Sequence, residues 1–346
     1  MATEPATDHS FENATAFAEE ARREHVHGVS PWRLALRRLK RNKTAIAFGV
    51  LFLVVVAMCL AAPLWANGPA GTDPYKNHLT ETILVDGKKT NVVSLDGVPI
   101  GPTWQGKFLL GADTNGRDTA VRLLYGGRNS LLIGLVAAFI TAILSVILGT
   151  VAGFVRGFTD TAISRSLDVI WAFPVILLGV ALGTALSLNG LELGPVKVSA
   201  ESKAIPILII AVVYIPYMAR PIRGQVLALR EKEFVEAARA QGASPLRIMI
   251  SEIVPNLAST VIVFFPLMVA NAILLEAALG FLGVGVKAPE PSWGTMIGDG
   301  VKHILSGPHL AIVPGLMLVI TVLALNAFGD GVRDAFDPRA TIRVEG

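Results

Sequence analysis

A short charged stretch after residue 230 carries the residues whose types and spacing point most directly to a function. Residues 231–241 read EKEFVEAARAQ and are strong helix formers, and Gly242 suits the left-handed residue that ends such a helix. The helix combines small residues, which let another backbone approach closely, with one apolar anchor and charged edges. The side chains that give it this character are Phe234, Glu236, Ala237, Ala238 and Arg239. This composition indicates a surface that binds a protein.

A second helical segment is expected directly after this surface. Ser244 and Pro245 have the residue types of an N-cap and a first helical position. Pro255 is predicted to break the segment, because proline lacks a backbone donor. The stretch 220–257 therefore predicts a bent helical pair. An ordinary surface helix pair is the alternative interpretation.

The sequence does not suggest catalytic chemistry of its own. It contains no G-x-x-x-x-G-K-[S/T] phosphate loop, no H-E-x-x-H metal motif and no G-x-S-x-G nucleophile elbow. The single cysteine, Cys59, cannot form an intramolecular disulfide. We therefore expect no catalytic residue, cofactor site or metal site on this chain, which disfavours a membrane enzyme.

The amino-acid composition indicates whether the chain lies in water or in a lipid membrane. Of 346 residues, 52% are hydrophobic and 16% are charged, and the mean hydropathy is +0.57. A soluble domain carries about 25% charged residues. The net charge of +3 is too small to favour nucleic-acid binding. These values indicate an all-α polytopic membrane protein.

Six apolar stretches reach the roughly 20 residues that a membrane-spanning helix needs. They are residues 45–66, 130–154, 167–188, 204–219, 258–283 and 310–331. With the N-terminus inside, the inward segments carry 19 Lys and Arg residues and the outward segments carry 11. This excess predicts that both termini are cytoplasmic.

The polar segments divide the chain further. Residues 1–28 are acidic and are expected to form a mobile cytoplasmic tail, and residues 29–44 a basic helix at the membrane interface. Residues 67–129 are expected to form a small external cap with a hairpin turn near Asp86-Gly87. Residues 130–346 would hold spans two to six, with 220–257 as their cytoplasmic loop.

Within the spans, Glu276 and Pro266 are the candidate pathway or gate residues. A carboxylate inside a membrane is a functional candidate by default, although Glu276 could equally hold neighbouring helices together. Pro266 is one of four prolines expected to kink the spans, the others being Pro174, Pro216 and Pro314. Glycines at four-residue spacing (Gly149, Gly153 and Gly157; Gly179 and Gly183) are interpreted as helix-packing positions.

Several motifs resemble those of one transporter family. Glu236-Ala237-Ala238, with Gly242 and Pro255 at matching distances, resembles the EAA coupling motif of ABC-importer permeases. Three further segments resemble dipeptide and oligopeptide permeases: LGADTNGRD with LYGGRNSL (110–131), EAALGFLGVG with PSWG (276–294), and GDGVRD with DPR (329–339). Together they identify the chain as similar to the C-type permease subunit of these binding-protein-dependent importers.

The resemblance implies a bacterial inner-membrane subunit that works with other chains. It implies a second, B-type permease subunit that completes the pathway, two ATPase subunits that hold ATP and Mg²⁺, and an external peptide-binding protein. Lipid surrounds the complex, and no nucleic acid is involved. Phe234, Glu236, Ala237, Ala238, Arg239, Gly242 and Pro255 would couple the pathway to the ATPases. The alternatives are an ABC permease for a nickel chelate or glutathione and, from another class, a stand-alone secondary transporter.

Overall fold

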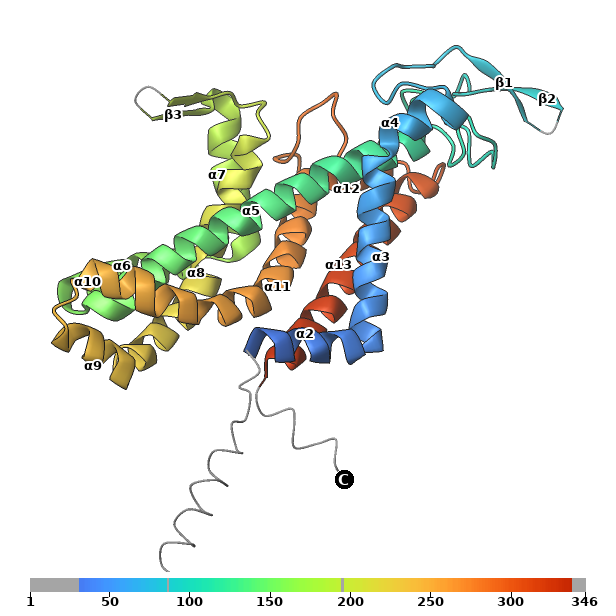
Figure 1. Cartoon of the computed structure of the whole chain (residues 1–346). Coiled ribbons are helices and arrows are strands. Elements are labelled where there is room, and N and C mark those ends of the chain that lie inside the picture. Colours follow the sequence, from blue (N-terminus) through green and yellow to red (C-terminus); the bar gives the residue numbers. More distant parts are fainter. Residues whose placement is uncertain (1–30, 86, 194–195, 338–346) are drawn as a thin grey trace, which may run out of the picture.

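The computed structural model describes residues 31–85, 87–193 and 196–337. The predicted tail (1–28) and part of the last motif (338–339) lie outside these ranges. The described chain is mostly helical, and Figure 1 shows two small β-hairpins at one end of the molecule and α9 and α2 at the other. The two described termini lie together at the α2 end, where Arg38 Nη1 donates to the Asp337 carbonyl oxygen at 2.9 Å.

The N-terminal part begins with a helix that lies across the N-terminal end of the next helix (Figure 1). These are α2 (Pro31–Arg41) and α3 (Lys43–Leu60), followed by α4 (Ala62–Trp65) and the π-helix η1 (Ala66–Ala70). Asn42 separates α2 from α3, because its side chain accepts a hydrogen bond from the Ala45 backbone N–H at 3.0 Å and so caps α3. Trp32 packs against Phe336 with ring centroids 5.3 Å apart, which fixes α2 to the end of the last helix.

The segment after η1 folds around a small apolar cluster of Val92, Val93, Phe108 and Ala112. The expected hairpin is confirmed: β1 (Thr82–Val85) pairs antiparallel with β2 (Lys88–Asn91). Asp118 ties this segment to the first long helix, because its carboxylate accepts from the Phe108 N–H at 2.7 Å and from Thr72 Oγ1 at 3.2 Å. Burial raises the pKa of the Asp118 carboxyl, while these hydrogen bonds act in the opposite direction.

Two parallel helices form the centre of the bundle, α5 (Thr119–Val155) and α8 (Ala204–Leu229). Thr141 Oγ1 donates to the Ala211 carbonyl oxygen at 3.2 Å, and Ser145 Oγ donates to the Ile215 carbonyl oxygen at 3.1 Å. From the first hydrogen bond to the second, both partners advance by four residues toward the C-terminus. The two helices therefore run in the same direction. Both are longer than the predicted spans (130–154 and 204–219).

The chain between α5 and α8 must return to the cap end, and a bent helix pair does this. Residues 167–188, predicted as one span, do not form one straight helix. Instead, α6 (Gly157–Ala172) and α7 (Val175–Asn189) meet at an angle of 93°. Pro174 forces the preceding Phe173 out of the helical region, to φ −90° and ψ 139°. A short hairpin of β3 (Leu191–Leu193) and β4 (Val196–Val198) follows.

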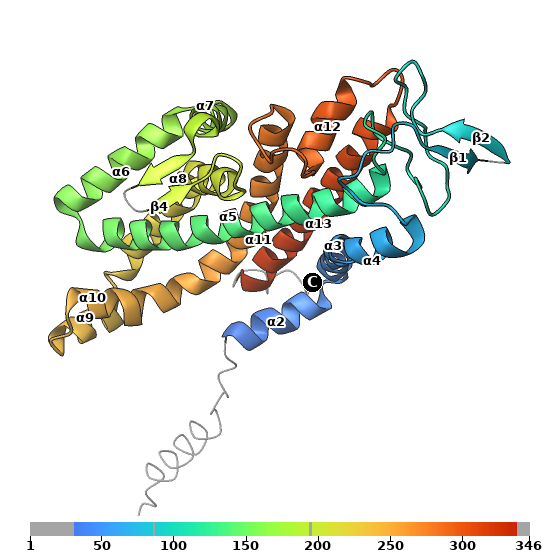
Figure 2. The ribbon, with the colours of Figure 1, turned by 90° about the horizontal axis from the view of Figure 1, so that it is seen from above.

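The second half of the bundle begins with the short helix α9 (Glu233–Ala240). It continues through α10 (Pro245–Ile248), the π-helix η2 (Met249–Ile253), α11 (Val254–Phe281), α12 (Trp293–Val301) and α13 (His309–Phe336). Seen from above, α3 and the α6–α7 pair lie at opposite edges, with α5, α8 and α11 between them (Figure 2). In the described residues five helices are long and apolar enough to span a membrane, or six if the bent pair counts as one span.

Close helix packing depends on several of the predicted glycines. A Cβ atom at Gly149 would lie 2.8 Å from the Ala219 carbonyl oxygen, and one at Gly153 would lie 2.8 Å from Val226 Cβ. A Cβ atom at Gly179 would lie 3.1 Å from a Leu279 methyl group, and one at Gly183 would lie 3.0 Å from Val284 Cβ. The packing interpretation is therefore confirmed for these four positions. It is wrong for Gly157, which has no neighbour within 4 Å and lies at the turn between α5 and α6 with φ +62°.

Candidate coupling surface and pathway residues

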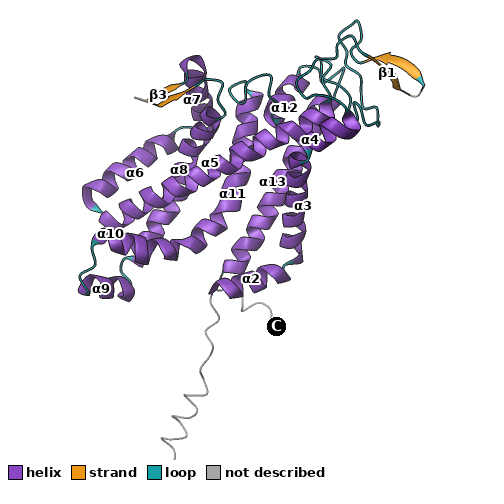
Figure 3. Ribbon diagram, turned by 45° about the horizontal axis from the view of Figure 1, so that its top comes forward, coloured by secondary structure: helices purple, strands orange, loops and turns teal. Residues whose placement is uncertain are grey.

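The short helix α9 is separate from the long helices and protrudes at the end opposite the hairpins (Figure 3). Its acidic first turn (Glu233 and Glu236) and basic last turn (Arg239) both suit the helix dipole. Val235 is fully buried and anchors the helix to the main apolar core. The helix is therefore held by one face, while its other face is free to contact another molecule.

Gly242 ends α9 in the conformation that the sequence predicts. Its φ is +78°, its N–H donates to the Arg239 carbonyl oxygen at 2.9 Å, and the Ala243 N–H donates to the Ala238 carbonyl oxygen at 3.0 Å. This pair of bonds is the Schellman motif. Ser244 then caps α10, with its Oγ accepting from the Arg247 N–H at 3.4 Å. The chain thus turns sharply at Gly242 and leaves α9 projecting.

Pro255 was predicted to end the helix that begins at Pro245, but the helix continues past it. The helix that begins at Pro245 runs on through η2 into α11, and together these residues form one segment to Phe281. Pro255 lies in the first turn of α11, directly after the π-helical turn of η2. A π-bulge accommodates the missing N–H of a proline without a break. Of the predicted pair, only α9 is therefore a separate short helix, and the second member is the first turn of a span.

The exposed residues around α9 form what we call the coupling surface. It consists of Phe234, Glu236, Ala237 and Arg239 with Leu246 and Ile250. Phe234 is 37% exposed, and Leu246 and Ile250 are more than 60% exposed. The last two residues were missed in the sequence, although their four-residue spacing places them on one helical face. Ala238 is half-buried and supports the helix from below.

The coupling surface is attached to the end of α5. The Arg239 guanidinium lies 5.7 Å from the centre of the Phe154 ring, and Arg230 Nη1 donates to the Phe154 carbonyl oxygen at 2.8 Å. Arg156 adds an ion pair with Glu231 at 3.0 Å. Arg156 itself has φ +61° and ψ −168°, a region nearly restricted to glycine. A displacement of α9 would therefore act on the junction of α5 and α6.

Charged residues also connect α6 with α8 at this end of the bundle. Asp160 accepts two hydrogen bonds from Arg223, and Asp168 Oδ1 accepts one from Arg220 Nη2 at 2.6 Å. The Arg220 guanidinium also lies 4.6 Å from the centre of the Trp171 ring. The four charged residues of these ion pairs line a hollow of about 500 Å³ between the two helices.

Glu276 lies far from the coupling surface, near the cap end of α11. Its side chain is fully buried, beside the hydroxyl groups of Ser130 and Ser292. Neither carboxylate oxygen makes a hydrogen bond within the described part of the chain. The surrounding contacts are tight: Trp293 N–H donates to Ser130 Oγ at 3.1 Å, and Trp293 Nε1 donates to the Leu123 carbonyl oxygen at 3.1 Å. Glu276 is thus enclosed where α5, α11 and α12 meet.

Pro266 is buried in the middle of α11 and faces α13. A Cβ atom at Gly329 would lie 3.2 Å from Pro266 Cβ. Pro266 also lines an apolar groove of about 680 Å³, with Phe139, Phe265 and Phe328. The structure therefore places Pro266, Glu276 and the coupling surface at three separate levels of the bundle.

Together these features define a multi-helix membrane protein with a protruding short helix that can contact a partner. Residues 145–342 match the family described as binding-protein-dependent transport system inner membrane component. Residues 30–81 match the N-terminal transmembrane domain of oligopeptide transport permease C. The chain belongs to the family of inner membrane components of binding-protein-dependent transport systems.

Two relatives illustrate how far the similarity extends. The dipeptide transport system permease protein DppC of Alkalihalophilus pseudofirmus is 37% identical over 311 residues, which cover 90% of this chain and 91% of that protein. The glutathione transport system permease protein GsiD of Salmonella typhimurium is 37% identical over 310 residues, with the same coverage.

A solved structure of the MetNI methionine ABC transporter in an inward-facing conformation shows a weaker similarity. It is 20% identical with a TM-score of 0.49, covering 62% of this chain and 96% of that one. Membership of the family makes the present chain a multi-pass inner-membrane permease component of an ABC importer, a class of subunit that is not itself catalytic.

Proposed function

We propose that this chain forms, with a second permease subunit, the pathway through which an ABC importer takes up dipeptides or oligopeptides. ATP hydrolysis would take place on two separate ATPase subunits that hold ATP and Mg²⁺. An external binding protein would deliver the peptide at the cap end, and both termini would be cytoplasmic. The names of the relatives support the substrate class, because one carries dipeptides and the other carries glutathione, itself a peptide.

The coupling surface is the observation that carries this proposal. A chain without a phosphate-binding loop nevertheless presents a separate short helix, ended by a Schellman motif, with an exposed phenylalanine and charged edges. The core residues of the coupling role would be Phe234, Glu236, Ala237, Ala238, Arg239 and Gly242, and Pro255 would link them to α11. When the ATPases close on nucleotide, they would push α9 and, through Phe154 and Arg156, the end of α5.

Glu276 and Pro266 would serve the pathway indirectly. The enclosed carboxylate of Glu276 would hold the junction of α5, α11 and α12 together near the outer mouth. Pro266 would let α11 bend against Gly329 when the pathway opens. Neither residue would need to touch the solute.

Transport by reconstituted proteins tests the proposal. Liposomes containing the two permeases and two ATPases, with the binding protein outside, are expected to accumulate a labelled dipeptide only when ATP is enclosed. The chain alone should show no uptake under a proton or sodium gradient. Gradient-driven transport by the chain alone would instead establish a secondary transporter. The ligand that co-purifies with the binding protein separates peptide from glutathione and nickel-chelate uptake.

A further inference from the structure

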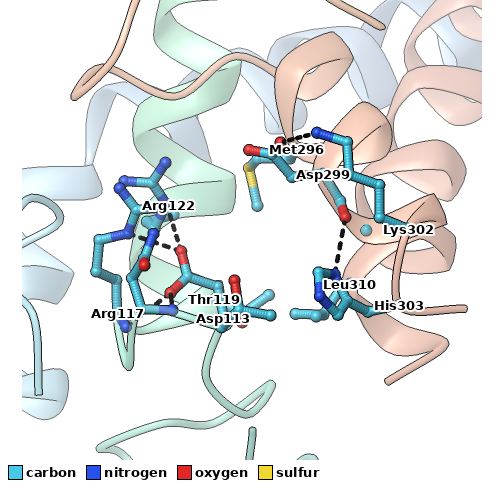
Figure 4. A pocket seen from close by; sticks show the side chains of 12 residues that line it. Asp113, Arg117, Thr119, Arg122, Met296, Asp299, Lys302, His303 and Leu310 are labelled. Carbon is cyan, nitrogen blue, oxygen red and sulfur yellow. Dashed lines mark hydrogen bonds and ion pairs between the residues drawn. The ribbon is translucent and has the colours of Figure 1, made fainter. Parts of the chain in front are cut away.

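A pocket of about 250 Å³ lies at the cap end, where α5 begins (Figure 4). Asp113, Arg117, Thr119 and Arg122 form one wall, and Met296, Asp299, Lys302 and His303 of α12 and the following turn form the facing wall. A neighbouring hollow of about 180 Å³ shares Arg117, Arg122, Asp299 and Lys302 with it. The two hollows therefore lie next to each other, with the arginines between them.

The inner wall of this pocket carries more positive than negative charge. The side chains of Arg117 and Arg122 are 13% and 7% exposed, and both guanidinium groups contact the same carboxylate oxygen of Asp113, at 2.7 Å and 3.3 Å. The other oxygen of Asp113 already accepts the backbone N–H groups of Asn115 and Arg117. Arg122 Nη1 also donates to the carbonyl oxygens of Pro74 at 2.8 Å and Pro289 at 3.4 Å, but these neutral acceptors bring no counter-charge. One carboxylate thus balances two nearly buried guanidinium groups, and a buried charge without a counter-charge is costly.

The facing wall does not correct this imbalance. Asp299 is 70% exposed and pairs with Lys302 Nζ at 3.2 Å, so this pair is neutral as a unit. His303 Nδ1 lies 3.3 Å from the Asp299 backbone oxygen. The excess positive charge therefore belongs to the arginine pair.

A buried hydroxyl group lies next to the arginines. Thr119 is 1% exposed, lines the pocket, and its Oγ1 has no hydrogen-bond partner within the described chain. It is not needed as a helix cap, because Asp118 accepts the N–H groups of Ala120 and Val121 at 2.9 Å and 3.2 Å. Buried hydroxyl groups are nearly always hydrogen-bonded, so an unpaired one beside excess positive charge indicates a missing acceptor.

We propose that this pocket binds the carboxylate of a small organic solute, such as the C-terminus of a short peptide. A guanidinium group binds a carboxylate through two parallel hydrogen bonds, and the Thr119 hydroxyl supplies a further donor. Met296 and Leu310 add apolar walls for the organic part of the solute. Only the choice of a peptide rests on the proposed function, since the charge and the unpaired hydroxyl do not depend on it.

Calorimetric titration of the assembled transporter in lipid nanodiscs, without the binding protein, tests this site. The probe is L-alanyl-L-alanine, and its C-terminal amide is the matched ligand without a carboxylate. We expect the dipeptide to bind and the amide not to bind. Arg117→Gln should weaken dipeptide binding about tenfold or more, and the isosteric Thr119→Val about threefold. Lys197→Gln, an equal change of charge in the distant β3–β4 hairpin, should have no effect.

The site would be overturned if the wild-type transporter carried out ATP-driven uptake and yet bound no dipeptide in this titration. Equal binding by wild type, Arg117→Gln and Thr119→Val, or equal binding of the amide, would also overturn it. A loss confined to binding-protein docking would do the same, since it would assign the arginines to a protein contact. In each case the proposed function would stand, because it is measured by uptake.

Discussion

Arg223 of α8 holds Asp160 of α6 through two parallel hydrogen bonds, from Nε to Oδ1 and from Nη2 to Oδ2, each of 2.6 Å. The contact fixes the two helices to one another at the end of the bundle that carries the coupling surface. Ser164 donates a third hydrogen bond to Oδ1 of the same carboxylate at 3.1 Å. A planar, two-point contact of this kind restricts the relative rotation of the helices more than a single ion pair does.

The pair should therefore contribute to both stability and transport. Asp160→Asn is expected to lower the free energy of unfolding by about 1 kcal/mol, since Arg223 is one-third exposed and partly solvated. Thermal unfolding of purified protein measures this. In a double-mutant cycle, Arg223→Gln should add little to Asp160→Asn. Fully additive losses would show that the two residues act independently.

Gly242 should be essential for coupling. Its φ of +78° makes alanine costly by about 1 kcal/mol, and no atom lies within 4 Å of the position of an added Cβ. Gly242→Ala, alone or with Glu236→Ala, should leave the protein folded and inserted but reduce ATP-driven uptake about tenfold or more and weaken ATPase association. Gly224→Ala is the matched control, because Gly224 has equal space but an ordinary helical backbone. Normal uptake by Gly242→Ala with ATPases bound would remove the coupling role.

The contact between α5 and α8 should not tolerate a side chain at Gly149. Gly149→Val would place carbon 2.8 Å from the Ala219 oxygen and should destabilise the bundle by about 1–3 kcal/mol. The control is Gly315→Val in α13, where nothing lies within 4 Å. Both variants are compared by thermal unfolding in detergent. If the two melted alike, the close approach of α5 to α8 would be incorrect.

Glu276 should behave as a structural residue. Glu276→Gln keeps the shape and the polar character of the side chain, and uptake should stay within about twofold of wild type. Glu276→Ala leaves a cavity at the junction of α5, α11 and α12 and should cost about 2–4 kcal/mol of stability. The two variants are compared by uptake and unfolding temperature. Loss of uptake in a fully stable Glu276→Gln protein would assign the carboxylate to the pathway.

Features that depend on local chemistry could be predicted from the sequence. The positive φ of Gly242, the cap at Ser244 and the hairpin of β1 and β2 each follow from residue types within a few positions. Most spans followed from hydropathy. The effect of a proline on a helix could not be predicted in this way. Pro174 lies at a 93° bend between two helices, whereas Pro255 follows a π-helical turn and leaves the helix unbroken. Only the neighbouring helices determine which of these outcomes occurs.

The cap pocket could not be predicted for a different reason. Arg117, Thr119 and Arg122 stand close in sequence, but they face α12 only because α11 returns the chain to the same end of the bundle. The sequence also does not show that the Thr119 hydroxyl is unpaired. This follows from the structure, in which Asp118 rather than Thr119 accepts the first backbone N–H groups of α5. Leu246 and Ile250 were missed because their exposure beside α9 depends on how the start of the long α10–α11 segment packs, which residue types alone do not determine.

Chemical cross-linking tests the central claim most directly, because the chain has one cysteine and it is buried. Ala237→Cys places the only accessible thiol on the exposed face of α9, and Thr82→Cys places one on β1 of the cap as control. A short thiol-to-amine cross-linker applied to the assembled transporter should join Ala237→Cys to an ATPase subunit and leave Thr82→Cys unattached to it. An ATPase product from the cap position, or none from α9 in an assembled transporter, would contradict the account.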